Sequence, residues 1–355
     1  MTSRFLKPAL HGFEPYQPGE QPPDGERWTK LNTNESALPP SPRVLDAIRS
    51  AVGESLRLYP SPTAAPARAA IAEAFGLDAA QVCIGNGGDE LIAMCFRAFA
   101  GAGGRVAFAP PTYPLLEPLC GIHEVGASPH PLEPDWALPE SFFADPAPLK
   151  FVVNPNSPTG TWVPSAGLER LVGESKGVVV VDEAYADFAP ETRLDLLRDH
   201  DNVLLLRTMS KAYALAGMRI GFALGSPELI AALDTVKDSY PVDRLAIAAA
   251  VAAIGDAGHH RRLVESVIAE RDWLSGQLAG IGFAVERSAT NFVFCRPPEG
   301  LDAARLVERL RERRILVRRY HRPPIDGWIR ITVGRREQHE LLLEAVGEVL
   351  AEEVA

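Results

Sequence analysis

The chain has 355 residues, of which 46% are hydrophobic and 23% are charged, so it is long enough for two domains and lies outside the disordered class. Its formal net charge of -10 excludes a general nucleic-acid binder, because neutralising phosphates requires a basic face. The start has no signal-type apolar core, and the longest apolar run, residues 245–254, is too short to span a bilayer. The four cysteines lie in apolar runs without CxxC spacing, which predicts buried thiols in a reducing cytoplasm rather than metal ligands: Cys83, Cys95, Cys120 and Cys295.

The first forty residues are dense in proline and glycine and predict an irregular arm. Between residues 80 and 235, short apolar runs alternate with longer helical segments, which indicates an α/β fold with a mostly parallel central sheet and helices on both faces. The runs predicted as strands are VCIG (82–85), RVAFA (105–109), KFVV (150–153), GVVVVD (177–182), NVLLLR (202–207) and RIGFALG (219–225).

Residues 244–280 predict a helical connector broken around Gly255 to Gly258. The remainder predicts a smaller α+β domain with strands at 283–286, 291–296 and 328–334 and helices at 305–314 and 340–353. The predicted organisation is an arm at 1–40 joining the small domain, a large α/β domain at 41–243, and a connecting helix with the small domain at 244–355.

Ligands of open parallel sheets gather at the carboxyl ends of the strands. After the strand at 82–85 comes NGGDE, where the backbone amides of Gly88 and Asp89 at a helix start are suited to a phosphate, although a glycine turn with an Asp cap gives the same pattern. After the strand at 105–109 comes PPTYP, whose Tyr113 can stack on a flat ring or simply pack.

Two more runs follow strands of the same predicted sheet. NPNSPTG (154–160) brings amide side chains to the edge, or forms a turn. In VVVVDEAYADF, the carboxylate of Asp182 follows four valines, and burying it is costly unless a cation faces it. Tyr185, three residues on, comes near the same point if the chain turns into a helix there.

The run TMSKAYALAGMRIGF (208–222) brings Thr208, Ser210 and Lys211 to this edge. Ser210 and Arg219 can clamp a phosphate, which leaves the Lys211 amine free to react once its pKa is lowered from about 10.4. A lone Ser-Lys pair is weak evidence for a reactive lysine, and the prediction depends on the whole set of residues at this edge. Pyridoxal phosphate needs an amine for its aldehyde, a carboxylate for its ring nitrogen, a donor for its ring oxygen and an anion site.

Over nearly its whole length the chain resembles the fold-type I pyridoxal-phosphate aminotransferases, most closely their histidinol-phosphate branch. SKxxxLAGxRxG together with DEAYxxF is specific for the superfamily, and PYQPG with NTNES points to the branch. The matching runs are PYQPG (15–19), LNTNESALPPSP (31–42), LYPSP (58–62), GNGGDELI (85–92), PTYP (111–114), NPNSPTG, VVDEAYADF, SKAYALAGMRIGF and IRITVG (329–334).

The resemblance implies a role for each matching residue. Lys211 would bond the cofactor aldehyde and then move the proton from the substrate Cα to the cofactor C4′. Asp182 would pair with the ring nitrogen, and Tyr185 would bond the ring oxygen. Tyr113 would stack on the ring, and Tyr59 would reach the cofactor phosphate of the neighbouring subunit, which implies an obligate homodimer with shared sites. The cofactor phosphate would be held by Gly88, Asp89, Ser210 and Arg219, with Thr208 as a further candidate.

At the substrate end, Arg330 resembles the arginine that binds the substrate carboxylate. Arg318 resembles an arginine near the substrate phosphate, with Arg319 and Arg322 as open alternatives. Tyr16 and Asn34 of the arm are expected to line this end of the pocket.

One position departs from the family pattern. The family usually has an Asn directly before the PTG, bonding the cofactor ring oxygen, whereas this chain has Ser157 there. Asn156, one residue earlier, is assigned to that role, with Ser157 as the open alternative.

The implied reaction is transamination of L-histidinol phosphate with 2-oxoglutarate in histidine biosynthesis, in the cytoplasm, with small-molecule substrates and neither metal, nucleic acid nor membrane. An aromatic amino-acid aminotransferase or a phosphothreonine-type decarboxylase on the same scaffold is the alternative, because specificity lies in the site rather than the fold. A nicotinamide-binding oxidoreductase is disfavoured, since GNGGDE does not make GxGxxG.

Overall fold

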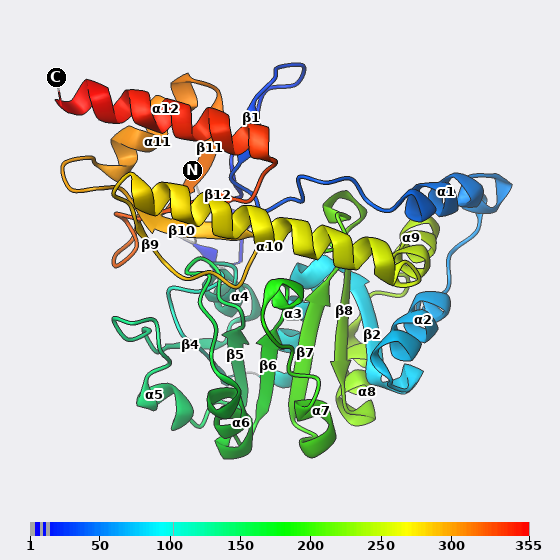
Figure 1. Ribbon diagram of the computed structural model, residues 1–355. Helices are drawn as coiled ribbons and strands as arrows, with labels where there is room; N and C mark the ends of the chain where they lie inside the picture. The colour runs from blue at the N-terminus through cyan, green and yellow to red at the C-terminus, as the bar shows by residue number, and fades with distance from the viewer. Residues whose placement is uncertain (1–3, 8–9, 12–14, 102, 355) are drawn as a thin grey trace.

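The protein is described here by a computed structural model covering residues 4–7, 10–11, 15–101 and 103–354. Two sheets organise the chain (Figure 1). The larger has seven strands in the order β2-β8-β7-β6-β5-β3-β4. Its strands are β2 (Val82–Asn86), β3 (Arg105–Phe108), β4 (Gly126–Pro129), β5 (Leu149–Val153), β6 (Val178–Asp182), β7 (Val203–Thr208) and β8 (Ile220–Gly225).

Neighbouring strands of the larger sheet are parallel except at β8, which runs antiparallel to both β2 and β7. Alternate side chains of β6 pack into the two hydrophobic cores on opposite faces of the sheet. Val179 and Val181 pack with α2, α6 and α9, whereas Val180 packs with α3, α4 and α8. A strand buried on both faces needs an unbroken apolar run, and therefore the central strands of this sheet could be predicted from the sequence. The predicted mostly parallel sheet with helices on both faces is confirmed.

The helices around this sheet are α1 (Pro42–Ala51), α2 (Ala65–Phe75), α3 (Gly87–Phe99), α4 (Leu116–His123), α5 (Glu140–Phe143), α6 (Ser165–Glu174), α7 (Leu196–Asp199), α8 (Pro227–Val236) and α9 (Arg244–Ile254). Short 3-10 helices are η2 (Glu54–Arg57), η3 (Ala79–Gln81), η4 (Ala186–Phe188) and η5 (Ala216–Met218).

The smaller sheet has the order β1-β11-β12-β10-β9 and packs against α10, α11 and α12. The long helix α10 runs from beside this sheet across to α9 (Figure 1). The break predicted between the two helices is confirmed, because Asp256 caps α10 by accepting from the backbone N–H of His259 at 3.2 Å. The elements are β1 (Thr29–Leu31), α10 (Ala257–Gly280), β9 (Ala284–Val285), β10 (Phe292–Arg296), α11 (Ala303–Glu312), β11 (Ile315–Arg319), β12 (Ile329–Thr332) and α12 (Arg336–Val354).

Three strands differ from the sequence expectation. The arm is not wholly irregular, because β1 pairs in parallel with β11 and ties the arm to the smaller sheet. β11 carries two half-buried arginines that mask its strand pattern, and β4, with the sequence GASP, is a mostly exposed edge strand. The domain boundaries after residues 40 and 243 stay predictions.

All four cysteines are buried and unpaired. Within the described ranges, the helices are all too short or too polar to cross a membrane.

Candidate active site

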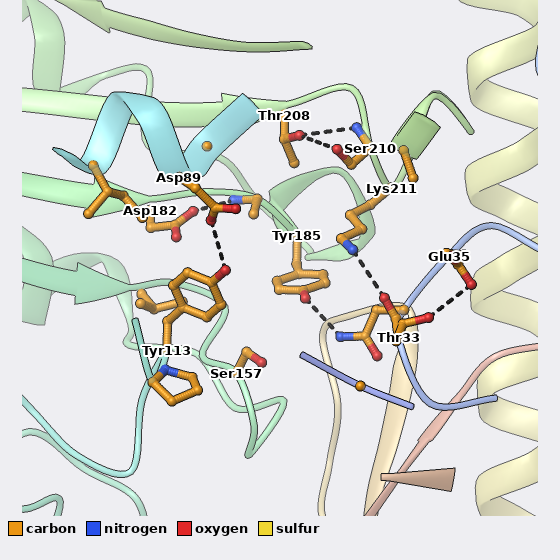
Figure 2. A pocket seen from close by; sticks show the side chains of 18 of the residues that line it. Thr33, Glu35, Asp89, Tyr113, Ser157, Asp182, Tyr185, Thr208, Ser210 and Lys211 are labelled. Carbon is orange, nitrogen blue, oxygen red and sulfur yellow. Dashed lines mark hydrogen bonds between the residues drawn. The ribbon is translucent and has the colours of Figure 1, made fainter. Parts of the chain in front are cut away.

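A cavity of about 390 Å³ lies where the carboxyl ends of β5, β6 and β7 face β11 and β12 of the smaller sheet. The arm contributes its third side, so both sheets and the arm form one site. Figure 2 shows side chains from these segments pointing toward one another across the cavity. The predicted residues that line it are Tyr16, Asn34, Gly88, Asp89, Tyr113, Ser157, Asp182, Tyr185, Thr208, Ser210, Lys211, Arg219, Arg318 and Arg330.

Lys211 follows β7 by three residues, and its side chain reaches into the cavity (Figure 2). The amine donates to the backbone carbonyl of Thr33 at 3.4 Å. Burial, reinforced by the nearby Arg330 guanidinium, lowers the pKa of Lys211 to about 8. Near physiological pH an amine with this pKa is still mostly protonated, but its neutral, nucleophilic fraction is far larger than that of an ordinary lysine.

Asp182 is the last residue of β6 and is buried at the floor of the cavity. Its Oδ1 accepts from the backbone N–H of Ala184 at 3.0 Å. Burial first, then the Asp89 and Glu183 carboxylates, raise its pKa to about 6. A carboxylate in this position is stabilised by any cationic group that enters the cavity.

The predicted phosphate cradle forms where the start of α3 meets the loop after β7. Ser210 accepts a hydrogen bond from the Thr208 hydroxyl at 2.9 Å. The Arg219 guanidinium lies against Gly87, where an added Cβ would come within 2.6 Å of its Nη2. Gly87 has a φ of +79°, so glycine is needed there for both conformation and space. Backbone amides at a helix start, a hydroxyl and an arginine together suit an anion.

Tyr113 stands on the opposite side of the cavity from Lys211 (Figure 2). Its hydroxyl donates to Asp89 Oδ1 at 2.8 Å, and its ring centroid lies 6.0 Å from that of Tyr16. Burial raises the pKa of Tyr113. The Tyr113 ring therefore lies at the cavity wall, where it can stack on an aromatic ring.

Two arginines extend into the cavity from the smaller sheet. Arg330 donates to Ser157 Oγ at 3.2 Å and to the Asn32 carbonyl at 3.1 Å. Arg318 donates to the carbonyls of Gln17 at 2.9 Å and Pro18 at 3.2 Å, which fixes the arm beside the site.

Among the three open arginines, only Arg318 lines this cavity. Arg319 points elsewhere along β11, and Arg322 lies exposed beside Glu117, with Nη1 at 3.3 Å from its carboxylate.

Two predicted residues do not line the cavity. The Asn156 amide donates to the Pro111 carbonyl and to Thr159 Oγ1, both at 2.9 Å, whereas Ser157 lines the cavity. Which of the two contacts the cofactor stays a prediction, and the cavity favours Ser157. Tyr59 lies 77% exposed, with its ring stacked on Tyr240. Its predicted role in a neighbouring subunit stays a prediction.

Sequence reasoning missed Thr33, Glu35 and Tyr320, which also line the cavity. Glu35 accepts from Lys30 at 2.5 Å, and although burial opposes ionisation, this bond and the one from the Thr33 hydroxyl keep its pKa below the usual range. Glu35 thus supplies negative charge near Lys211. The arm was expected to reach the pocket through Tyr16 and Asn34, but nothing in its sequence indicated that Thr33 and Glu35 would also face the cavity.

Comparison with known proteins extends the resemblance. A family model described as aminotransferase class I and II matches residues 26–346. Two relatives are named histidinol-phosphate aminotransferase: one from Aromatoleum aromaticum is 44% identical over 98% of this chain and 99% of its own, and one from Geotalea uraniireducens is 43% identical over 94% and 96%. The crystal structure of histidinol-phosphate aminotransferase from Sinorhizobium meliloti in complex with pyridoxal 5′-phosphate superimposes with a TM-score of 0.89 at 28% identity, over 99% of both chains.

Proposed function

The chain belongs to the class I and II aminotransferase family, and on that premise we propose that it transfers the amino group of L-histidinol phosphate to 2-oxoglutarate, giving imidazole acetol phosphate and glutamate in histidine biosynthesis. The observation that carries the proposal is the joint placement of Lys211, Asp182 and two arginines around one cavity. The names of relatives that share 44% and 43% identity with the chain support the same substrate.

The residues present fit pyridoxal phosphate as the cofactor. Asp182 is a buried carboxyl that a cationic ring nitrogen would stabilise. Gly87 leaves room for Arg219 beside the backbone amides of Gly88 and Asp89, where a phosphate would sit. When bound, the cofactor supplies an electron sink for the pair left behind as the substrate Cα proton departs.

Each residue of the cavity has a proposed role toward this cofactor. Lys211 would hold the cofactor and would carry the substrate Cα proton, a task suited to an amine with a pKa of about 8. Asp182 would keep the ring nitrogen protonated, Tyr185 would donate to the ring oxygen, and Tyr113 would support the ring face. Ser210 and Thr208 complete the phosphate site with Arg219.

Substrate recognition is proposed for the two arginines of the smaller sheet. Arg330 binds the carboxylate of 2-oxoglutarate and glutamate, and Arg318 binds the phosphate of histidinol phosphate, with Tyr16 beside it. Arg318 already holds two arm carbonyls, so a phosphate bound there also contacts the arm. The proposed enzyme is a cytoplasmic homodimer in which Tyr59 reaches the partner's cofactor phosphate, and its buried, unpaired cysteines suit a reducing compartment.

The test is a panel of amine donors assayed with 2-oxoglutarate on the purified protein. We expect a yellow protein that borohydride bleaches with the label on Lys211, and glutamate formation fastest with histidinol phosphate. Faster turnover of phenylalanine or tyrosine would move the assignment to an aromatic aminotransferase. Release of CO₂ from phosphothreonine would make the protein a decarboxylase. A colourless protein that does not bind pyridoxal phosphate would reject the proposed function.

A further inference from the structure

The phenol oxygen of Tyr185 accepts a side-chain hydrogen bond within the protein. Asn34 Nδ2 donates to it at 2.8 Å. Ser157, which also lines the cavity, accepts from Arg330 Nη1 at 3.2 Å. A phenol oxygen accepts through its lone pairs and has one proton to give.

The orientation of the Asn34 amide is fixed by the smaller sheet. Its Oδ1 accepts from the Thr332 hydroxyl at 3.2 Å, while its backbone N–H donates to the same Oγ1 at 2.9 Å. Its carbonyl accepts from Asn291 Nδ2 at 3.0 Å. With the amide oxygen occupied by Thr332, the NH₂ group faces Tyr185.

The backbone at Asn34 supports this arrangement. Its φ of +55° lies in the left-handed region, where Asn is among the few side chains that are readily accommodated. The residue is 2% exposed, and both ends of its amide are engaged by protein side chains, Thr332 and Tyr185.

The ring of Tyr185 is fixed as well. It packs edge-on against Phe292, with centroids 5.3 Å apart and an interplanar angle of 87°. The remaining freedom is rotation of the hydroxyl proton about the C–O bond. Because Asn34 approaches the oxygen as a donor, that proton is directed away from the amide, and the phenol lines the cavity.

We propose that Asn34 is a positioning residue that holds the Tyr185 hydroxyl proton toward the ring oxygen of the cofactor. The inference rests on the proposed function, because it assumes a pyridoxal-type ring in the cavity. It changes the expected role of Asn34 from substrate binding to control of a hydrogen-bond donor to the cofactor.

The experiment is a pH titration of the visible absorption of bound cofactor in the holoenzyme. A donor to the ring oxygen stabilises its anionic form, so weakening that donor raises the titration midpoint. Asn34→Gly removes the amide and keeps a residue suited to the left-handed backbone. We expect its midpoint to rise by roughly half to one pH unit, the size of one hydrogen bond, and that of Tyr185→Phe to rise further.

The decisive measurement combines the two changes. If Asn34 acts through the phenol, Asn34→Gly shifts the midpoint in the native background and produces no further shift in the Tyr185→Phe background. The charged groups nearest Tyr185, Arg330 on β12 and Asp182 on β6, are unchanged in both backgrounds, so their contribution cancels. An equal shift in both backgrounds, or no shift in either, overturns the proposal.

Two further variants test the proposal if Asn34→Gly fails to fold. Asn34→Asp keeps the size and accepts the phenol proton instead of donating, so its midpoint should exceed that of Asn34→Gly; a lower one would contradict the proposal. Thr332→Val releases the amide oxygen and should give a smaller shift in the same direction, and an unmoved midpoint there would also count against it. A native enzyme that binds no pyridoxal phosphate would instead defeat the proposed function.

Discussion

Burial shifts the two central titratable groups of the cavity in opposite directions. It raises the pKa of Asp182 to about 6 and lowers that of Lys211 to about 8. In both cases the low-dielectric surroundings favour the neutral form. Burial therefore makes both charges costly in the empty cavity, and a ligand that brings a cationic ring to Asp182 and an aldehyde to Lys211 offsets that cost.

The Asp182 shift makes the stability of the cofactor-free protein depend on pH. Between its unfolded pKa of about 3.9 and its folded pKa of about 6, the native state keeps a proton that the unfolded chain releases, so the free energy of unfolding falls as pH rises through this window. The loss is about 3 kcal/mol at full ionisation. Asp182→Asn should remove this fall. Urea unfolding of both cofactor-free proteins at pH 4 and pH 7 measures it, and parallel pH profiles would contradict the assignment.

Arg330 is predicted to serve only carboxylate-bearing substrates. Arg330→Ala should raise KM for 2-oxoglutarate and glutamate by roughly 10- to 100-fold, because one charge-assisted contact is lost. Histidinol phosphate has no carboxylate, so its KM should change little. Arg318→Ala is the matched control, with the opposite preference expected. Equal damage to histidinol phosphate in the Arg330 variant would mean that this arginine also serves the phosphate or the architecture.

At the level of elements, the contact between α3 and the loop before β8 sets the phosphate cradle. Gly87→Ala would place a Cβ 2.6 Å from Arg219 Nη2 at a φ of +79°, so the guanidinium must move. Gly76 also has positive φ, +66°, but an added Cβ there meets nothing within 4 Å. Both alanine variants should lose about 1 kcal/mol of stability from backbone strain. Only Gly87→Ala should also weaken cofactor binding, by at least tenfold in a fluorescence titration; equal Kd values would refute the cradle.

The same elements show what sequence can and cannot predict. β5 to β8 were predictable because strands buried on both faces require apolar runs, and Asp182, Lys211 and Arg219 followed from motifs at their ends. β4 and β11 were missed, since an exposed edge strand and an arginine-bearing strand lack that pattern. The place of Glu35 in the cavity and of Asn156 outside it were beyond reach, because they depend on how the arm and a turn fold in three dimensions.

At the scale of the whole molecule, one surface is unusually apolar for a single subunit. Exposed large hydrophobic side chains gather in residues 45–59 and 240–251, around α1, η2 and α9, which lie together at one side in Figure 1. Such a patch indicates a protein interface. The side chains are Leu45, Val52, Leu56, Leu58, Tyr59, Tyr240 and Val251. We expect the second copy of the chain to cover them, which also brings Tyr59 to the partner's cavity.

Subunit mixing tests this arrangement. Lys211→Ala lacks the reacting amine, and Tyr59→Ala should bind cofactor weakly when cofactor is limiting. In a hybrid dimer, the cavity of the Tyr59→Ala subunit keeps its own Lys211 and receives Tyr59 from the other subunit, so one site is complete. Random exchange of equal amounts should then restore about a quarter of native activity, since half the dimers are hybrids with one intact site each.

A mixture of Lys211→Ala with Asp182→Ala is the control, because each of its cavities lacks one residue of its own chain. Recovery no greater than in that control would show that Tyr59 serves only its own subunit, or none, and the shared-site dimer would have to be abandoned.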